Sequence, residues 1–188
     1  MKKTIGIIAG SLRKESFSKK IAKALLEMAP NNFTFKIISI EDLPLYNQDF
    51  DDENQVPESY VHFRNTIASL DGIIFVTPEY NRSVPAVLKN AIDVASRPHG
   101  KNAWDGKPGV IFSNSPGKIA GFGANHHLRQ SLVFLNIPVM QQPEVYLSEI
   151  DKSLDKNGNI TNPKTKEFLQ KAINSYLDWF GKNSEHKS

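Results

Sequence analysis

The chain has 188 residues, of which 39% are hydrophobic and 23% are charged, and its formal net charge is +3. This length suits one core, so we expect residues 1–188 to form a single domain, and the composition is that of a globular protein rather than a disordered or membrane one. Cysteine is absent, which excludes disulfides, thiolate catalysis and cysteine-ligated metal and is typical of cytoplasmic proteins. No apolar run approaches the roughly 20 residues of a transmembrane helix. We therefore expect a cytoplasmic protein with no membrane partner.

The positive charges are scattered along the chain, and lysine is concentrated only at the termini and in one early helix. Nucleic-acid-binding proteins carry a concentrated basic patch, so we expect no nucleic-acid partner. A mildly basic surface also attracts small molecules that carry phosphate.

Five short runs of β-forming residues alternate with helical patterns along the chain. The runs cover residues 4–9, 34–39, 72–76, 110–113 and 139–147, and the last one continues past Pro143. The first and third runs are apolar throughout, which is typical of parallel strands that are covered on both faces. The alternation predicts an α/β fold with a doubly wound parallel sheet.

The spacing of apolar residues predicts helices over residues 21–28, 61–70, 85–95, 128–135 and 168–180. We expect Ser83 to cap the third of these helices and Pro85 to lie in its first turn. Residues 49–57 and 151–163 are polar and rich in turn formers, so we expect surface loops there. The residues after Gly181 are polar and are expected to be frayed.

Ligands of doubly wound sheets bind at the carboxyl ends of the strands, so the loops after the first, third and fourth strands are the candidate site. The first loop carries hydroxyl groups at Ser11, Ser16 and Ser18, a guanidinium at Arg13 and the amides of a following helix. These donors favour a phosphate monoester, because the glycine-rich dinucleotide and triphosphate motifs are missing. The alternative is an ordinary turn in which Ser16 or Ser18 only caps the helix.

The second loop, residues 77–85, is stiffened by Pro78 and Pro85 and presents the ring of Tyr80. Such a loop can hold a flat heteroaromatic ring, although Tyr80 can equally pack on a neighbouring side chain. The third loop, residues 113–118, is small and polar and is expected to line the opposite side of the same pocket.

Three stretches together resemble the NADPH-dependent FMN reductase family, and within it the bacterial quinone and chromate reductases of the flavodoxin-like fold. They read GSLRKESFS, PEYNRSVPAVLKNAIDVASRP and HLRQSLVFLNIPVMQQPE. The resemblance implies the strand order 2-1-3-4-5, noncovalent FMN, NADPH or NADH as co-substrate, and a homodimer or homotetramer. The implied cofactor-binding residues lie in all three loops: Ser11, Arg13, Ser16, Phe17, Ser18, Pro78, Glu79, Tyr80, Asn81, Ser83, Ser113, Ser115, Pro116 and Gly117.

The chain departs from the pattern of this family at three positions. Ser18 stands where the family usually has asparagine, Arg82 where relatives often carry an aromatic residue, and Gly123 where an arginine usually begins a helix. The arginine's role in subunit contacts or acceptor choice therefore does not transfer, and Arg82 makes the mouth of the expected pocket more cationic.

The resemblance implies an enzyme that passes hydride from a nicotinamide cofactor through FMN to quinones, azo compounds, chromate or free flavin. Because flavin supplies the reactive atoms, we expect no catalytic side chain, and we expect backbone N–H groups of residues 113–117 to stabilise negative charge on the reduced ring. The rival hypotheses are a flavodoxin-type electron carrier and, ranked last, a hydrolase or nucleotide-binding regulator.

Histidine and tryptophan suggest alternatives that the pattern does not favour. His126 and His127 are adjacent, so on a helix they point about 100° apart, which is poor geometry for one shared metal. We expect no metal site, and we expect Trp104 and Trp179 to lie in the core or at a rim.

Overall fold

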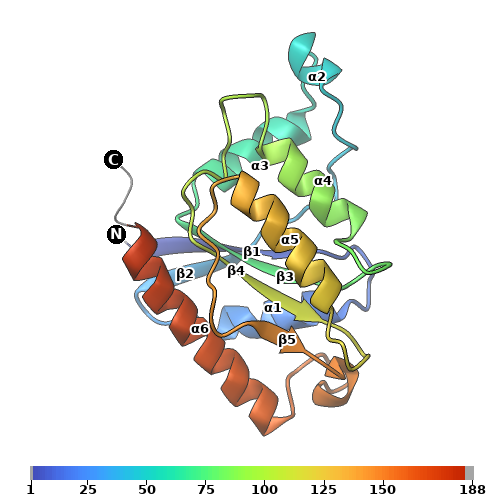
Figure 1. The fold of residues 1–188 in the computed structure, drawn as a ribbon, viewed down its shortest axis with the longest axis vertical. Coiled ribbons are helices and arrows are strands. Elements are labelled where there is room, and N and C mark those ends of the chain that lie inside the picture. Colours follow the sequence, from blue (N-terminus) through green and yellow to red (C-terminus); the bar gives the residue numbers. More distant parts are fainter. Residues whose placement is uncertain (1, 185–188) are drawn as a thin grey trace.

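A computed structural model describes residues 2–184, and its centre is a five-stranded parallel sheet (Figure 1). The strands are β1 (Lys3–Ala9), β2 (Phe33–Ile37), β3 (Gly72–Thr77), β4 (Gly109–Asn114) and β5 (Val145–Leu147). Their order is β2-β1-β3-β4-β5, and every neighbouring pair is parallel. The predicted α/β, flavodoxin-like fold with strand order 2-1-3-4-5 is confirmed.

Helices cover both faces of the sheet (Figure 1). One face carries α1 (Phe17–Glu27) and α6 (Pro163–Ser184), and the other carries α3 (Glu58–Ala68), α4 (Ala86–Ala95) and α5 (Phe122–Phe134). A short helix, α2 (Asp49–Asp52), projects beyond the layers, and a 3₁₀ turn, η1 (Ile150–Ser153), follows β5.

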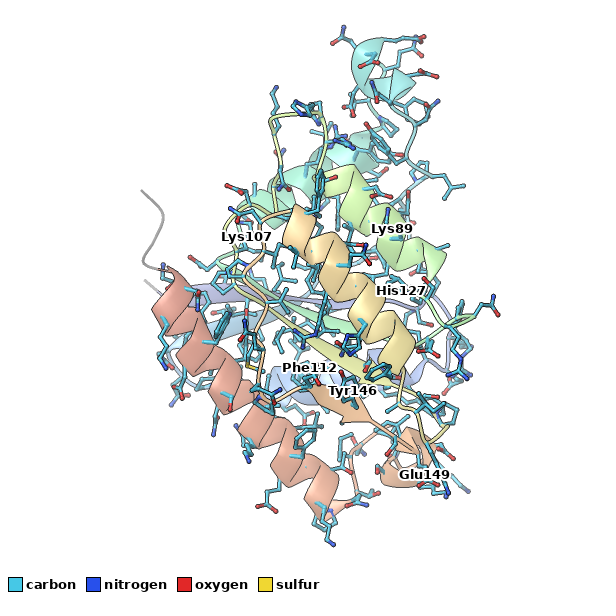
Figure 2. The ribbon with its side chains drawn as sticks, viewed as in Figure 1. Lys89, Lys107, Phe112, His127, Tyr146 and Glu149 are labelled. Carbon is cyan, nitrogen blue, oxygen red and sulfur yellow. The ribbon has the colours of Figure 1, made fainter. Side chains whose placement is uncertain are left out.

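Alternation along the strands builds a core on each side of the sheet. In β3, Ile74 and Val76 pack in the cluster that includes α1 and α6, whereas Ile73 and Phe75 pack in the cluster that includes α3, α4 and α5. Phe112 of β4 is fully buried on the α1 and α6 side (Figure 2). Burial of each such side chain contributes roughly 1.5–3 kcal/mol, so both faces are firmly held and the strand ends are fixed in place.

The two tryptophans have structural roles. Trp104 is fully buried between Phe63 and Phe75, and its Nε1–H donates to the carbonyl of Ile92 at 2.9 Å. Trp179 donates to the carbonyl of Pro138 at 2.9 Å. The expected core role of Trp104 is confirmed.

The predicted strand over residues 139–147 is wrong over most of its length. Strand β5 contains only Val145–Leu147, and Val139 makes a single isolated bridge to Gly109. Gln141 and Gln142 are exposed, and Pro143 has no N–H to donate to a strand ladder, so the chain leaves the sheet between these points.

Helix boundaries also differ from the prediction. Ser83 does not cap α4, because the helix begins at Ala86 and Pro85 occupies the position before it. The predicted loop over residues 49–57 contains α2, and the predicted loop over residues 151–163 begins inside η1. Helix α6 continues past Gly181 to Ser184, and the rest of the predicted frayed tail lies outside the described residues. Among residues 2–184, no helix combines the length and apolar character needed to span a bilayer.

Candidate functional site

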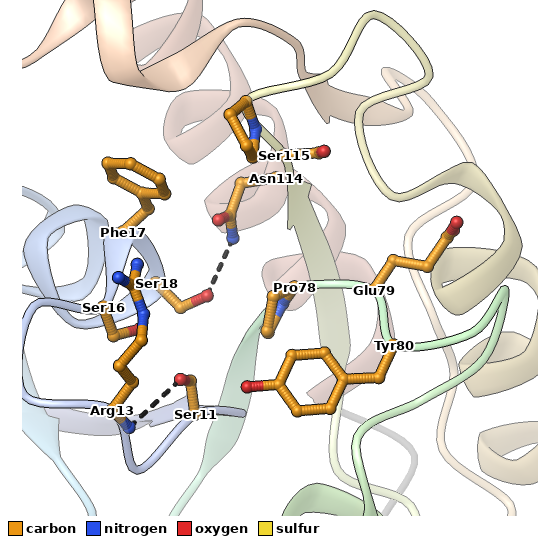
Figure 3. A pocket seen from close by; sticks show the side chains of 11 residues that line it. Ser11, Arg13, Ser16, Phe17, Ser18, Pro78, Glu79, Tyr80, Asn114 and Ser115 are labelled. Carbon is orange, nitrogen blue, oxygen red and sulfur yellow. Dashed lines mark hydrogen bonds between the residues drawn. The ribbon is translucent and has the colours of Figure 1, made fainter.

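The loops that follow β1, β3 and β4 enclose a cavity of about 340 Å³ at the carboxyl end of the sheet (Figure 3). This volume lies in the usual range of small-molecule sites, roughly 300–1,000 Å³. The lining residues come from all three loops: Ser11, Arg13, Ser16, Phe17, Ser18, Pro78, Glu79, Tyr80, Asn114, Ser115 and Pro116. The structure therefore brings together most of the side chains that the sequence predicts for the cofactor site.

Gly10, the first residue after β1, lies close to β3 and α4. Its N–H donates to the carbonyl of Val76 at 2.8 Å. A Cβ atom at this position would lie 2.9 Å from Cδ2 of Leu88 and 3.3 Å from Oγ1 of Thr77. A larger residue at position 10 would require the Leu88 side chain to shift, so glycine favours a loop that starts directly beside the end of β3.

Three serine side chains from this loop and the start of α1 line the cavity and accept hydrogen bonds from the protein. Ser11 Oγ accepts from the N–H of Arg13 at 3.3 Å, Ser16 Oγ accepts from the N–H of Lys19 at 3.3 Å, and Ser18 Oγ accepts from the side-chain amide of Asn114 at 2.9 Å. Within residues 2–184, none of these three O–H groups donates a hydrogen bond to a protein acceptor. A hydroxyl that accepts in this way retains its own hydrogen as a donor, which a ligand oxygen can receive.

The start of α1 adds further positive character. The N–H groups of Phe17 and Ser18 lie in the first turn of α1, where the helix itself offers no acceptor. The Arg13 guanidinium lies 5.4 Å from the centroid of the Phe17 ring at the edge of the cavity. Together with the helix dipole, these groups favour an anion.

The alternative for this loop was an ordinary turn in which Ser16 or Ser18 only caps the helix. It is partly confirmed, because Ser16 caps α1. The cap uses the oxygen of Ser16 as an acceptor, and the same side chain lines the cavity. Capping and ligand binding are therefore compatible here.

Asn114 forms the floor of the cavity and is a residue that sequence reasoning did not single out. Its side-chain amide donates both to Ser18 Oγ at 2.9 Å and to the carbonyl of Thr77 at 3.1 Å, and the residue is buried. It thus joins the ends of β3 and β4 to the start of α1. The available signal was its position at the carboxyl end of β4, because ligands of such sheets bind at the carboxyl ends of the strands.

The second loop forms an aromatic wall. Tyr80 lines the cavity and is 53% exposed, so its ring is available rather than packed away as the alternative had it. The turn behind it is closed by hydrogen bonds from Tyr80 N to Ser83 O at 3.1 Å and from Ser83 N to Tyr80 O at 2.9 Å. Figure 3 shows the tyrosine ring opposite the serine-bearing loop.

The third loop contributes side chains to the cavity, and two of its backbone N–H groups have partners within the protein. Ser115 and Pro116 line the cavity. However, Ser115 N–H donates to the carbonyl of Leu147 at 3.1 Å, Gly117 N–H donates to Ser115 Oγ at 3.0 Å, and Pro116 has no N–H. The expectation that backbone N–H groups of residues 113–117 stabilise negative charge on a reduced ring stays a prediction, and these two partners count against Ser115 and Gly117 as the donors.

Four of the predicted cofactor-binding residues do not line the cavity: Asn81, Ser83, Ser113 and Gly117. Ser113 is fully buried and its hydroxyl donates to the carbonyl of Val145 at 3.3 Å, so it supports β5 instead. Ser83 Oγ lies 3.0 Å from Nδ1 of His127. Asn81 is an exposed turn residue, and Gly117 is exposed beyond the rim.

The two adjacent histidines of α5 face different partners. Nε2 of His126 lies 3.1 Å from the hydroxyl of Tyr146, and burial raises the pKa of Tyr146 to about 12. His127 faces Ser83. Over the part of the chain that the structure describes, no group of three or more histidine, aspartate or glutamate side chains has an arrangement that could hold a metal ion.

A parallel sheet of order 2-1-3-4-5, with a donor-rich turn after β1 beside an aromatic wall, is typical of the flavodoxin-like class of mononucleotide-binding folds. The profile of one family within that class, described as NADPH-dependent FMN reductase, matches residues 3–152. The chain belongs to this family.

Individual relatives agree with this assignment. The chain is 52% identical over 176 residues to a quinone reductase of Pseudomonas putida, with 94% of each chain covered. It is 46% identical over 175 residues to 2-hydroxy-1,4-benzoquinone reductase of Burkholderia sp, with 93% of this chain and 94% of the relative covered. A solved structure, the flavoenzyme NAD(P)H:(acceptor) oxidoreductase FerB from Paracoccus denitrificans, is 38% identical with a TM-score of 0.89, covering 96% of this chain and 98% of FerB. The predicted class is confirmed: the chain is a flavoenzyme oxidoreductase that uses FMN and a nicotinamide nucleotide.

Proposed function

We propose that this flavoenzyme is a quinone reductase that passes hydride from NADPH or NADH, through FMN, to quinones and other small oxidised acceptors. Relatives that are 52% and 46% identical over nearly the whole chain are named for quinone reduction. The observation that carries the proposal is the cavity itself, in which unpaired serine O–H donors face an exposed tyrosine ring.

The donor set fits FMN. The hydroxyls of Ser11, Ser16 and Ser18, the first N–H groups of α1 and the Arg13 guanidinium together match the several acceptor oxygens of a phosphate monoester. Lys20 forms an ion pair with Glu15 at 3.0 Å, and this contact lowers the pKa of Glu15. The one carboxylate of the loop is thus turned toward a lysine, and Arg13 keeps the cavity edge cationic.

The remaining lining residues suit a flat ring. Pro78 and Tyr80 form an apolar and aromatic wall, and Ser115 with Pro116 bounds the opposite side. When bound, FMN supplies a ring that accepts hydride from the nicotinamide and passes it to the acceptor. The protein's contribution is to grip the phosphate, hold the ring between the two loops and leave one side open to the two substrates in turn.

Flavin reduction by the nicotinamide alone tests the proposed function. The purified protein, reconstituted with FMN, is expected to lose its yellow colour within seconds of NADPH or NADH addition and to regain it when benzoquinone is added. Stopped-flow absorbance of the flavin follows both half-reactions. Colour that persists with either nicotinamide until a partner protein is supplied would identify an electron carrier instead.

We also propose that the chain forms a homo-oligomer through α4 and α5. A groove of about 670 Å³ runs between these helices, and its lining includes Phe134, which is 84% exposed. The preceding residue of α5, Val133, lies outside the groove and is 71% exposed. Exposed apolar side chains gathered at a groove favour association. The cytoplasmic location stays a proposal as well, supported by the absence of cysteine from the sequence.

A further inference from the structure

Glu79 lines the cavity, yet its carboxylate is directed away from it (Figure 3). Its Oε2 atom accepts a hydrogen bond from the N–H of Ala124 at 3.0 Å, in the first turn of α5. Its Oε1 atom lies 3.6 Å from Nη1 of Arg82, and the Glu79 side chain is only 14% exposed. A partly buried carboxylate at the N-terminus of a helix is stabilised by the helix dipole and by the hydrogen bond that it accepts from a first-turn N–H.

The loop that this contact holds has an uncommon backbone. Asn81 and Arg82 both adopt left-handed conformations, with φ of 51° and 65°. Residues other than glycine adopt this conformation at a cost, so contacts elsewhere must stabilise the turn. Two such contacts reach α5: the bond from Ala124 to Glu79, and the 3.0 Å approach of Ser83 Oγ to Nδ1 of His127.

Gly123 makes the approach of this loop to α5 possible. A Cβ atom at Gly123 would lie 2.6 Å from the carbonyl oxygen of Arg82 and 3.0 Å from Oε2 of Glu79. The first of these atoms is backbone and cannot swing aside. Gly123 lies inside helix α5, where any residue adopts the backbone conformation, so the requirement for glycine is one of space.

We propose that Glu79 is a positioning residue: its carboxylate clamps the Pro78–Tyr80 wall onto the N-terminus of α5, and Gly123 provides the space for this clamp. The inference rests on the proposed function, in which that wall supports the flavin ring. The clamp acts on ring placement and leaves the phosphate grip, which belongs to a different loop, unchanged. It also directs a negative charge away from the place where hydride transfer adds negative charge to the ring.

Removal of the clamp is therefore expected to slow flavin reduction without matching loss of FMN affinity. Gly123→Ala and Glu79→Ala are each expected to lower the rate constant of flavin reduction at saturating NADPH by about tenfold or more, since small misplacements of reacting atoms have effects of this order. The dissociation constant of FMN is expected to change less than about threefold, because the phosphate donors are untouched. Glu79→Gln, which retains an acceptor for Ala124 N–H, is expected to recover most of the rate lost in Glu79→Ala.

The matched control is Gly181→Ala on α6, where an added Cβ meets nothing within 4 Å. This variant is expected to reduce its flavin at the parent rate. The measurements are stopped-flow reduction by NADPH and calorimetric titration of the deflavinated protein with FMN, with thermal unfolding to show that each variant folds. Parent-like reduction in Gly123→Ala, an equal loss in Glu79→Gln and Glu79→Ala, or FMN affinity that falls in parallel with the rate would overturn the clamp. A parent protein that neither binds FMN nor reduces it would instead sink the proposed function.

Discussion

Asn114 shows at the scale of a single residue how this fold makes a site. Its amide donates to Ser18 Oγ at 2.9 Å and to Thr77 O at 3.1 Å, so one buried side chain joins segments that are far apart in the sequence. Because Ser18 Oγ accepts from Asn114, the Ser18 hydroxyl keeps its own hydrogen for another acceptor, and Ser18 lines the cavity. Stability and ligand binding therefore meet in one residue.

We predict that Asn114→Ala lowers both the stability of the fold and the affinity for FMN. The loss of two buried hydrogen bonds, at about 1 kcal/mol each, is expected to lower the free energy of unfolding by about 2 kcal/mol. FMN affinity is expected to fall by about tenfold, because Ser18 loses its orientation. Urea denaturation and calorimetry measure the two effects. Asn174→Ala, on the exposed surface of α6, is the control, and equal effects in the two variants would contradict this role.

Residue types identified the candidate loops, but not which side chains face the cavity. Hydroxyls, arginine and a proline-stiffened tyrosine pointed to the correct three loops, and most of the side chains named there line the cavity. Ser113 was included and Asn114 left unmarked because the end of β4 lies one residue later than the sequence indicates. Successive residues of a strand point to opposite faces. An error of one residue therefore selected Ser113, which supports β5, in place of Asn114, which lines the cavity.

At the scale of elements, an ion pair joins α2 to α3, beside the packing of Phe50 on Tyr60. Nη1 and Nη2 of Arg64 donate to the two carboxylate oxygens of Asp51 at 2.7 and 2.8 Å, and Nε donates to the carbonyl of Val94 at 2.9 Å. The Asp51 side chain is 6% exposed and also accepts from the hydroxyl of Tyr46 at 3.1 Å. The Arg64 hydrogen bonds lower the pKa of Asp51, against the opposing effect of its burial.

The lowered pKa of Asp51 predicts how the contribution of its ion pair to stability depends on pH. Because the pKa of Asp51 is lower in the folded chain than its ordinary value of 3.8, its stabilisation is fully present above that value and is lost as the pH falls through the folded pKa. Asp51→Asn is expected to lower the free energy of unfolding by about 2–4 kcal/mol at neutral pH. The deficit is expected to shrink below the ordinary pKa. Denaturation of both proteins at neutral pH and near pH 3 tests this, and a deficit that stays constant would contradict it.

The parallel direction of the strands was predictable from the residue pattern and their order from the family resemblance, whereas the extent of the last strand was not predictable from either. Apolar runs such as β3 are buried on both faces, and this burial makes them readable. Strand β5 lies at the edge of the sheet and pairs only with β4, so its length depends on where the chain leaves its neighbour rather than on its composition. The cap at Ser83 failed for a similar reason, since the contact of Ser83 with His127 comes from another helix.

At the scale of the whole molecule, the two cores share one sheet, which supports the prediction that residues 1–188 form a single domain. The groove between α4 and α5 lies on the outer surface of the second core, with Phe134 at its edge. A second copy of the chain placed there would bury the aromatic side chain of Phe134, and a buried aromatic side chain typically removes about 150–250 Å² of surface from water.

We therefore predict that Phe134→Glu lowers the molar mass of the particle in solution to that of the 21.1 kDa chain, because a buried, unpaired carboxylate opposes association. Light scattering over a range of concentrations measures the mass. Leu45→Glu is the control, because Leu45 is 77% exposed and does not line the groove. A parent protein that is monomeric throughout, or a variant with the parent's mass, would contradict an interface at this groove.

The central claim is that the turn after β1 grips the phosphate of FMN, and the most direct measurement compares FMN with riboflavin, which lacks that phosphate. Calorimetric titration of the deflavinated protein is expected to show FMN binding at least about 100-fold more tightly than riboflavin, as several charge-assisted hydrogen bonds imply. Arg13→Ala is expected to reduce this preference by about tenfold or more, whereas Lys14→Ala, at an exposed cation that does not line the cavity, is expected to leave it nearly unchanged. Equal affinity for the two flavins, or a preference that Arg13→Ala leaves intact, would contradict the claim.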